Sequence, residues 1–331
     1  MASYYSQAAQ HVKKELANAM PHDEIRRLHR IQPWKHFLIV FRQFALLAGS
    51  TFVLARFTNP LIWIPAAFVQ GFTIFNFTVL LHEVVHNAVF VPGKASRKFN
   101  RIMGLVYAFP SGISASQFTR WHLDHHAGLG SPTEDPKRFY LSPKINKRWI
   151  KILYFTPALF FIYFRAAARE TATYKPELQA MIRRERLFTI LFQLSLMGLC
   201  YLLGGSGVMA RVYMVPVFLV FPIAFALNRL GQHYNIRPED PAQWSTLVKS
   251  SWFWNFAFLY SNFHLEHHYF PGVPFYNLAR IHKLMQPFYK ARGMKAYGYG
   301  ELIYRYIVLN GKPHTDWEPQ TVSTPPLAAA L

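Results

Sequence analysis

Four long apolar runs divide the chain, and they fall into two closely spaced pairs. The runs cover residues 37–56, 61–81, 187–204 and 212–228. A helix needs about 20 mostly apolar residues to cross roughly 30 Å of hydrocarbon, so each run is long enough, or nearly so, to span a membrane. Because few residues separate the members of a pair, each pair is predicted to form an antiparallel hairpin. The pattern therefore predicts an all-α integral membrane protein with four transmembrane helices in two hairpins.

Two shorter apolar stretches lie between the hairpins. Residues 149–164 have basic residues at both ends, and a short helix with such flanks is predicted to lie in the membrane interface. The alternative is that this stretch crosses the membrane and reverses everything that follows it. Residues 102–118 are interrupted by Pro110 and Gly112, so they are predicted to form a second interfacial piece.

The rest of the chain is assigned to a polar cap and a tail. The cap comprises residues 82–186 and 229–310, and the whole chain, residues 1–331, is interpreted as one domain. Residues 318–331 are expected to form a disordered tail. Residues 1–30 lack an apolar core, so no cleavable signal peptide is expected.

Composition narrows the class of protein, and charge orients it. The 331 residues are 52% hydrophobic and 17% aromatic, with 36 Lys and Arg against 16 Asp and Glu. This aromatic content excludes disorder over most of the chain, and the single cysteine, Cys200, excludes a disulfide scaffold. If the N-terminus is cytoplasmic, 33 of the 36 basic residues fall on the cytoplasmic side of the four spans. The net charge of +20 is therefore assigned to membrane topology rather than to nucleic-acid binding, and the cap is predicted to be cytosolic.

Histidine spacing supplies the candidate chemistry. Nine of the 15 histidines form three clusters and one outlier: His82 and His86 in HEVVH, His122, His125 and His126 in HLDHH, His264, His267 and His268 in HLEHH, and His233. On a helix, residues three and four positions apart share a face, so each cluster can direct its rings at a metal. The four-span topology also brings all nine to one side of the membrane. We therefore predict a metal centre built from nine imidazoles.

The number and type of these ligands indicate the metal. Neutral imidazole suits zinc, copper, iron and nickel, but a tetrahedral zinc uses only four ligands. Nine histidines indicate two metal ions with four or five ligands each, and an all-nitrogen shell that cycles between redox states favours iron. The other histidines lack this spacing and are expected to be solvated: His11, His22, His29, His36, His282 and His314.

The first histidine cluster also fits a different metalloenzyme class, and two roles are possible for the acidic residues inside the clusters. HEVVH at 82–86 matches the HExxH signature of zinc proteases, with Glu83 as the base. That class needs one further ligand and would leave most of the other histidines without a role, so a membrane zinc protease is kept only as an alternative. Glu83, Asp124 and Glu266 are predicted either to accept the second N–H of ligand imidazoles or to pair with the basic cap.

Three motifs carry a resemblance to a known family. HEVVH at 82–86, WHLDHH at 121–126 and FHLEHHYFPGVP at 263–274, together with His233 after the last predicted span, resemble the histidine boxes of the membrane-bound fatty acid desaturase superfamily. The resemblance covers residues 34–274. It implies a di-iron centre with two iron ions per chain held by the nine histidines, four spanning helices, and an active site on the cytoplasmic face.

The resemblance also implies a reaction class. Such an enzyme uses O2 and external electrons to desaturate a fatty acyl or related lipid chain, and the metal carries the chemistry. The chain has no flavin or nucleotide motif and no CxxC pair, so a separate electron carrier such as ferredoxin, rubredoxin or cytochrome b5 is expected. Alternatives within the class are a hydroxylase or ketolase of a lipid or carotenoid, and an oxidative decarboxylase of free fatty acids that gives terminal alkenes.

Overall fold

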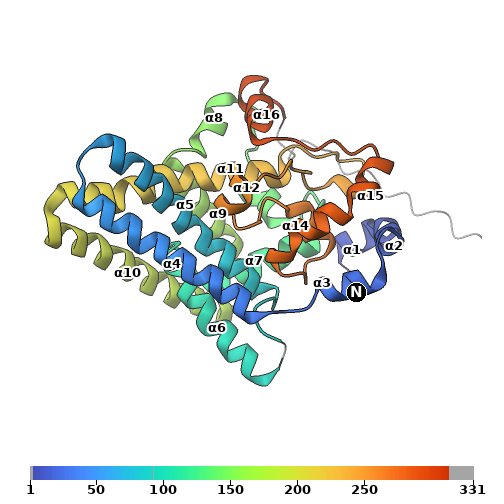
Figure 1. The fold of residues 1–331 in the computed structure, drawn as a ribbon, viewed down its shortest axis with the longest axis horizontal. Helices are drawn as coiled ribbons and strands as arrows, with labels where there is room; N and C mark the ends of the chain where they lie inside the picture. The colour runs from blue at the N-terminus through green and yellow to red at the C-terminus, as the bar shows by residue number, and fades with distance from the viewer. Residues whose placement is uncertain (1–2, 92, 313–331) are drawn as a thin grey trace, which may run out of the picture.

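The computed structural model describes residues 3–91 and 93–312, and these form helices joined by loops (Figure 1). An isolated parallel bridge joins Val248 to Tyr297. In chain order the helices are α1 (Tyr4–Ala8), α2 (Gln10–Ala19), α3 (His22–Leu28), α4 (Pro33–Arg56), α5 (Pro60–Val85), α6 (Lys94–Ala108), α7 (Ala115–Gly128), η1 (Lys137–Leu141), α8 (Arg148–Leu153), α9 (Ala158–Thr171), α10 (Pro176–Met209), η2 (Ala210–Val220), α11 (Phe221–His233), η3 (Pro241–Gln243), α12 (Trp252–Ala257), α13 (His264–Tyr269), α14 (Phe275–Leu284), α15 (Gln286–Ala291), α16 (Tyr299–Ile303) and η4 (Tyr304–Val308).

The first long hairpin consists of α4 and α5. The chain leaves α4 at Phe57, which is extended, and Asn59 caps α5 by accepting a hydrogen bond from the N–H of Leu61 at 3.0 Å. Pro60 occupies the first turn of α5, where its missing N–H would have no helical partner in any case. The two helices pack along each other, as the short connection requires (Figure 1).

The second long hairpin consists of α10 and the continuous segment of η2 and α11. Gly204 and Gly205 have non-helical backbone angles, and the φ of Gly205 is +68°. Glycine adopts this left-handed conformation without steric cost, and the chain reverses there (Figure 1). The hydroxyl of Tyr213 consequently donates to Gln193 Oε1 at 2.8 Å. A straight helix would hold these two residues about 30 Å apart.

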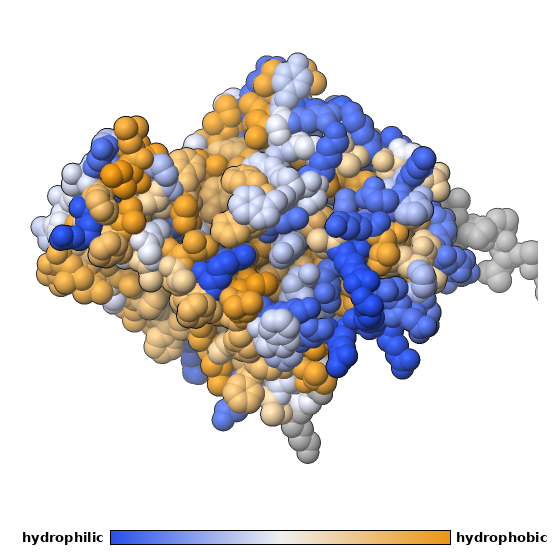
Figure 2. Space-filling view, viewed as in Figure 1, coloured by the Kyte–Doolittle hydropathy of each residue, from blue (hydrophilic) through white to orange (hydrophobic). Residues whose placement is uncertain are grey.

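Apolar helices gather at one end of the molecule. Three stretches of the described chain are long and apolar enough to cross a membrane: Pro33–Arg56, Pro60–Val85 and Pro176–His233, the last of which contains the reversal. Figure 2 shows hydrophobic residues over the end that holds α4, α5 and α10, and hydrophilic residues over the end that holds α14 and α15. The all-helical class is confirmed, and the candidate membrane helices lie where the apolar runs predict helices.

Helix α5 is the centre of this apolar end. Of the most apolar 18-residue segment of α5, 61% is buried inside the structure, whereas only 22% of the corresponding segment of α4 is buried. Gln70 of α5 accepts from Ser50 of α4 at 3.0 Å and donates to the carbonyl of Val212 in η2 at 2.5 Å. Its neighbour Gly71 lets η2 approach, because a Cβ at that position would lie 2.5 Å from Val220. Small residues and polar side chains are common where membrane helices meet, and here they join the two hairpins.

The two shorter apolar stretches do not form long helices. Residues 149–164 are divided between α8, which ends at Leu153, and α9, which begins at Ala158. Helix α9 has 14 residues, a length of about 21 Å, which falls short of the roughly 30 Å of hydrocarbon. Residues 102–118 are likewise divided between α6 and α7. The predicted tail, residues 318–331, lies outside the described residues.

Candidate metal centre

Nine histidines from distant parts of the chain meet in two groups at the ends of α5 and α11. The first group is His82, His86, His122, His126 and His267, and the second is His125, His233, His264 and His268. Within each group, one ring nitrogen per residue lies within 4.8 Å of all the others. These are the nine histidines that the sequence spacing singles out, and the structure brings all of them together.

Helical spacing divides each HxxHH cluster between the two groups. Helix α7 directs its first and last cluster histidines, four positions apart, at the first group, and the histidine between them, His125, at the second. Helix α13 divides its cluster the other way: His264 and His268 join the second group, and His267 joins the first. His82 and His86 come from the end of α5, and His233 is the last residue of α11. Each HxxHH cluster therefore ties the two groups together instead of serving one.

Helix α7 is held in place from its first turn. Ser114 caps the helix by accepting from the N–H of Gln117 at 3.1 Å. The side-chain amide of Gln117 then donates to the carbonyl of Ala167 in α9 at 2.8 Å. Glu185 of α10 accepts from the hydroxyls of Ser114 and Ser116, both at 2.6 Å. These contacts fix the direction in which the α7 histidines project.

The second group is buried, and two of its four rings have defined donor and acceptor nitrogens. His125 Nδ1 lies 2.8 Å from Asp135 Oδ1, and His233 Nδ1 lies 3.0 Å from the carbonyl oxygen of Trp244. Carboxylate and carbonyl oxygens only accept hydrogen bonds, so each Nδ1 carries the hydrogen and each Nε2 presents a lone pair. The two Nε2 atoms are 3.0 Å apart.

Two lone pairs that face each other at this distance repel unless a cation lies between them. A metal ion bound to imidazole nitrogen at about 2.0–2.1 Å removes that repulsion, and four neutral imidazoles form a donor set that first-row transition metals favour. The residues of the second group therefore fit a metal ion. The carboxylate and carbonyl behind the rings are the partners that orient histidine ligands in metal sites.

The first group is more open. Three of its five histidines are partly exposed. His86 Nε2 lies 2.8 Å from His122 Nε2, and His126 Nε2 lies 3.0 Å from His267 Nε2. Behind His122, the Nζ atom of Lys137 lies 3.2 Å from Nδ1. Burial lowers the pKa of His122 and of His126 well below the ordinary value, so both rings are neutral and able to act as ligands.

Two of the carboxylates inside the clusters have partners other than a ligand ring. Asp124 forms an ion pair with Arg120 at 2.8 Å on the surface. Glu83 is buried and accepts from the backbone N–H of Phe275 at 2.9 Å. Its distance to His82 Nδ1 is 3.4 Å, which is long for a hydrogen bond. Asp124 thus follows the ion-pair alternative, and Glu83 mainly joins the end of α5 to the start of α14.

Glu266 is the third of these carboxylates, and it is completely enclosed. It accepts from Nδ1 of His282 at 2.5 Å and from the hydroxyl of Tyr289 at 2.7 Å. His282 lies on α14 and Tyr289 lies on α15. Glu266 therefore anchors α13 to the C-terminal helices through a histidine that is not part of either group.

The remaining histidines only partly match the expectation that they are solvated. His11 and His22 are exposed, as expected. His36 is buried and bonded to a tyrosine hydroxyl at 3.0 Å. His282 is partly buried against Glu266, and His29 is partly buried with its ring against Phe270, so the expectation is wrong for these three. Each contacts a residue beyond its own helix, which spacing does not reveal. His314 lies outside the described residues.

Asp135 and Trp244 orient two histidines of the second group, and the spacing of the histidines predicted neither. Asp135 follows His125 by ten residues in the segment SPTEDPK, and this short acidic loop was the available signal. Trp244 acts through its backbone carbonyl, so its side chain gave no signal. Gly130, with a φ of +86°, lies so close to the Trp244 ring that an added Cβ would come within 2.2 Å of it.

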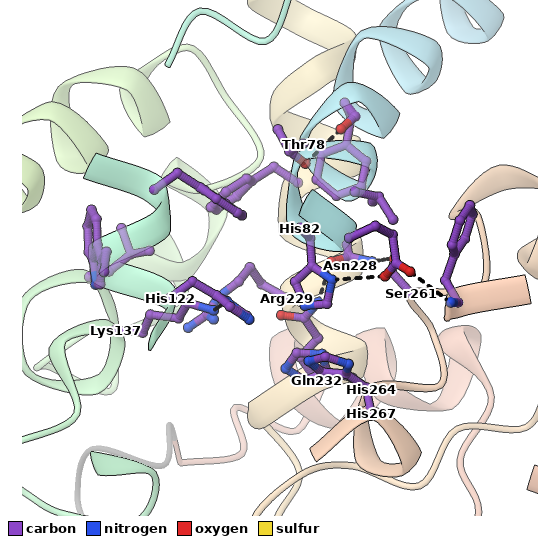
Figure 3. A pocket seen from close by; sticks show the side chains of 18 of the residues that line it. Thr78, His82, His122, Lys137, Asn228, Arg229, Gln232, Ser261, His264 and His267 are labelled. Carbon is purple, nitrogen blue, oxygen red and sulfur yellow. Dashed lines mark hydrogen bonds and ion pairs between the residues drawn. The ribbon is translucent and has the colours of Figure 1, made fainter. Parts of the chain in front are cut away.

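A cavity of about 100 Å³ adjoins the histidines (Figure 3). His82, His122 and His267 of the first group and His264 of the second form one wall. Most of the remaining wall is apolar. A second cavity of about 70 Å³ is lined mainly by aromatic and aliphatic side chains, and the two cavities share Thr78, Phe118, Tyr163 and Phe225.

Comparison with protein families identifies one that covers most of the chain. The family described as "Fatty acid desaturase" matches residues 58–299. The matched region contains all nine histidines of the two groups.

Individual relatives are more distant. The chain is similar to the sphingolipid delta(4)-desaturase/C4-monooxygenase DES2 of Homo sapiens, with 25% identity over 222 residues that cover 65% of this chain and 62% of the human protein. It is similar to the sphingolipid delta(4)-desaturase DES1 of Xenopus tropicalis, with 27% identity over 229 residues, 65% of this chain and 62% of the frog protein. The sphingolipid delta(4)-desaturase of Schizosaccharomyces pombe is 26% identical over 301 residues, 84% of this chain and 77% of the yeast protein. The chain thus spans less than two thirds of the length of the human and frog relatives.

Proposed function

This chain belongs to the fatty acid desaturase family, and from that premise we propose that it is a membrane di-iron oxidoreductase that uses O2 and external electrons to introduce a double bond into a fatty acyl or related lipid chain. The observation that carries the proposal is the pair of histidine groups beside an apolar cavity. The groups provide a place for two metal ions, and the cavity provides a place for an aliphatic chain next to them.

The nine histidines are proposed as the ligands of two iron ions per chain. The first group offers five nitrogens and the second four. Iron bound there supplies the capacity to reduce O2 and to break a strong aliphatic C–H bond, which protein side chains lack. The partly exposed first group leaves more room for an open coordination position than the enclosed second group.

The protein residues orient, position and exclude water. Asp135 and the Trp244 carbonyl hold His125 and His233 in the tautomer that directs Nε2 at the metal. Phe118 and Phe225, shared by the two cavities, flank the space for the aliphatic chain. Desaturation removes two hydrogens from that chain, and with two further electrons and two protons they reduce O2 to two waters.

The proposed topology has four crossings. Helices α4 and α5 account for two, and the two arms of the second hairpin, before and after Gly204, account for the others. This arrangement puts the ends of α5 and α11, where histidines occur, on the same side of the membrane. The distribution of basic residues supports a cytoplasmic location of that side, with residues 82–186 and 229–310 forming the cap.

The electrons require a partner. A separate carrier such as ferredoxin, rubredoxin or cytochrome b5 is proposed as the donor, because the chain has no flavin or nucleotide motif. The basic cap favours an acidic carrier electrostatically, and the same charge also favours anionic lipid headgroups.

Metal content and product analysis test the proposal. The full chain, purified from a membrane host that lacks the activity, is expected to contain about two iron ions per chain, and the host lipids are expected to contain new double bonds. The matched control is His125→Ala, which should give neither. One zinc without iron would overturn the proposal in favour of a membrane zinc protease.

A second outcome, hydroxylation, is favoured by one observation. The human relative is named as both a desaturase and a C4-monooxygenase. Hydroxylated lipids in the same mass-spectrometric comparison would assign this chain to that reaction, and oxidised carotenoids would assign it to hydroxylase or ketolase chemistry on pigments.

A further inference from the structure

A buried guanidinium faces the cavity without an anionic partner. Arg229 of α11 is 6% exposed and lines the cavity together with the histidines (Figure 3). Among the described residues, none of its three nitrogens has a partner with hydrogen-bond geometry, and it forms no ion pair with a carboxylate. Tyr234 lies beside it, with its ring centroid 5.8 Å from the guanidinium carbon, and offers a phenol hydroxyl but no counter-charge.

The charges around Arg229 add to the demand for an anion. Lys137 and the buried carboxyl group of Glu83 line the same cavity, and Glu83 is already engaged by the backbone N–H of Phe275. Asp135 interacts with Arg229 through its charge, but among the described residues the two form no ion pair, and Asp135 Oδ1 accepts from His125 and from the backbone N–H groups of Lys137 and Arg138. Histidine ligands are neutral, so metal ions held by them would bring further positive charge. A buried charge without a counter-charge is costly, which means that this cavity is suited to a negatively charged guest.

The shape of the site indicates which anion it suits. The guanidinium is planar and presents a fork of N–H donors that matches a carboxylate. On the same wall, Gln232 donates to Asn228 at 2.6 Å and Asn228 donates to Ser261 at 2.8 Å, which adds a short polar strip beside Arg229. The rest of the cavity and the adjoining second cavity are largely aromatic and aliphatic. A ligand with a small anionic group at one end, for Arg229, and a long apolar chain, for the rest of the two cavities, fits this site.

We infer that Arg229 binds the carboxylate of the substrate inside the cavity, so that this enzyme acts on free fatty acids rather than on neutral esters or amides. The inference rests on the proposed function, because it assigns a substrate class to the same site. The carboxyl end then lies beside the histidines, and the aliphatic chain extends past Phe118 and Phe225 into the second cavity. The C–H bonds closest to the carboxyl group are the ones nearest the metal ligands.

The test compares an acid with its neutral ester in the full chain as purified, with its iron content measured, in phosphatidylcholine nanodiscs. Equilibrium binding of radiolabelled dodecanoate and of methyl dodecanoate is measured for the wild type, Arg229→Met, Arg229→Lys and Arg42→Met. Arg229→Met is expected to weaken dodecanoate binding by roughly 10- to 100-fold, since it removes a charge-assisted hydrogen bond. Binding of the methyl ester should stay within about threefold, because the ester has no charge to lose.

Two further variants separate a binding role from a structural one. Arg229→Lys keeps the charge but loses the fork, so it should recover part of the affinity for dodecanoate. Arg42 of α4 also has guanidinium nitrogens without partners but does not line the cavity, so Arg42→Met should change neither ligand. An equal loss of acid and ester, or unchanged dodecanoate binding in Arg229→Met, would overturn the inference.

Iron content and lipid oxidation distinguish failure of the inference from failure of the proposed function. If the iron-loaded wild type oxidises neutral lipids and binds acid and ester equally, the inference fails and the proposed function stands. If the wild type contains no iron but binds dodecanoate through Arg229, the proposed function fails and the carboxylate site stands.

Discussion

The two histidine groups differ in how their rings are held and in what they face. In the second group all four histidines are buried, and the Nδ1 atoms of His125 and His233 donate to fixed acceptors. In the first group three of five histidines are partly exposed. Three of the four cavity-lining histidines also belong to the first group.

This difference indicates that the second group mainly holds metal, whereas the first group also faces the substrate. Two rings of the second group, those of His125 and His233, have their orientations set by Asp135 and by the backbone carbonyl of Trp244. The first group adjoins the cavity, where substrate must be placed. Disturbing the second group should therefore lower metal retention and stability together, whereas disturbing the first should lower turnover with less effect on stability.

The largest effect is expected from removing one ligand in each group. His125→Ala and His82→Ala should each reduce turnover by about 10³-fold or more, because both metal positions are required. His125→Ala should also destabilise the protein by roughly 1–3 kcal/mol, since it removes a hydrogen bond to the charged carboxylate of the buried Asp135. His82→Ala should cost less. Turnover and thermal unfolding measured on both variants check this, and greater destabilisation by His82→Ala would contradict the comparison.

The next largest effect is expected from Asp135→Asn. Loss of the carboxylate behind a ligand histidine typically lowers metal affinity by about 10- to 100-fold, and here the loss should be confined to the second group. A chelator titration should then release roughly half of the iron at a lower chelator concentration than the rest, in proportion to the two metal positions. Release of all iron in a single step, as in the wild type, would show that Asp135 does not orient His125.

A smaller effect is expected from Gly130→Ala, which disturbs the second group through the backbone. An added Cβ would lie 2.2 Å from the Trp244 ring, and Gly130 has a φ of +86°. The variant should lose about 1–3 kcal/mol of stability and some iron affinity, because the Trp244 carbonyl holds His233. Gly293→Ala is the matched control: its φ is +61° but its Cβ would meet nothing within 4 Å. If both variants retain iron equally, the contact with Trp244 does not support the metal centre.

The smallest effect is expected from Asp124→Asn. Asp124 lies between two ligand histidines of α7, but its carboxylate pairs with Arg120 on the surface. Exposed ion pairs contribute about 0–1 kcal/mol, so the melting temperature, iron content and turnover should all stay close to wild type. A loss of iron similar to that of Asp135→Asn would mean that Asp124 supports the metal ligands after all.

Local patterns predicted a large part of this protein. The apolar runs predicted the helices of both hairpins, and the glycines at 204 and 205 mark the reversal of the second. The histidine spacing selected the nine residues that converge, because helical periodicity depends only on neighbours a few positions away. The spacing did not reveal how each HxxHH cluster is divided, since His125 and His267 join the groups opposite to their cluster neighbours.

Contacts between distant segments were beyond these patterns. The positions of His36 and His282 in the sequence follow no motif. His36 is nevertheless buried against Tyr107, 71 positions away, and His282 binds Glu266, 16 positions away. The partner of His233 is a backbone carbonyl, and any residue type supplies a carbonyl. No motif records such a contact.

The sequence by itself determined that the chain is all-helical, that its basic residues gather outside the apolar runs, and which nine histidines converge. These properties follow from side-chain type and from helical periodicity, which act over a few residues. Only the tertiary structure decided how each HxxHH cluster is divided, that Asp135 lies behind His125, and that Arg229 faces the cavity without an anion. Each of these depends on the relative positions of segments that lie far apart in the chain, and the packing of the helices sets those positions.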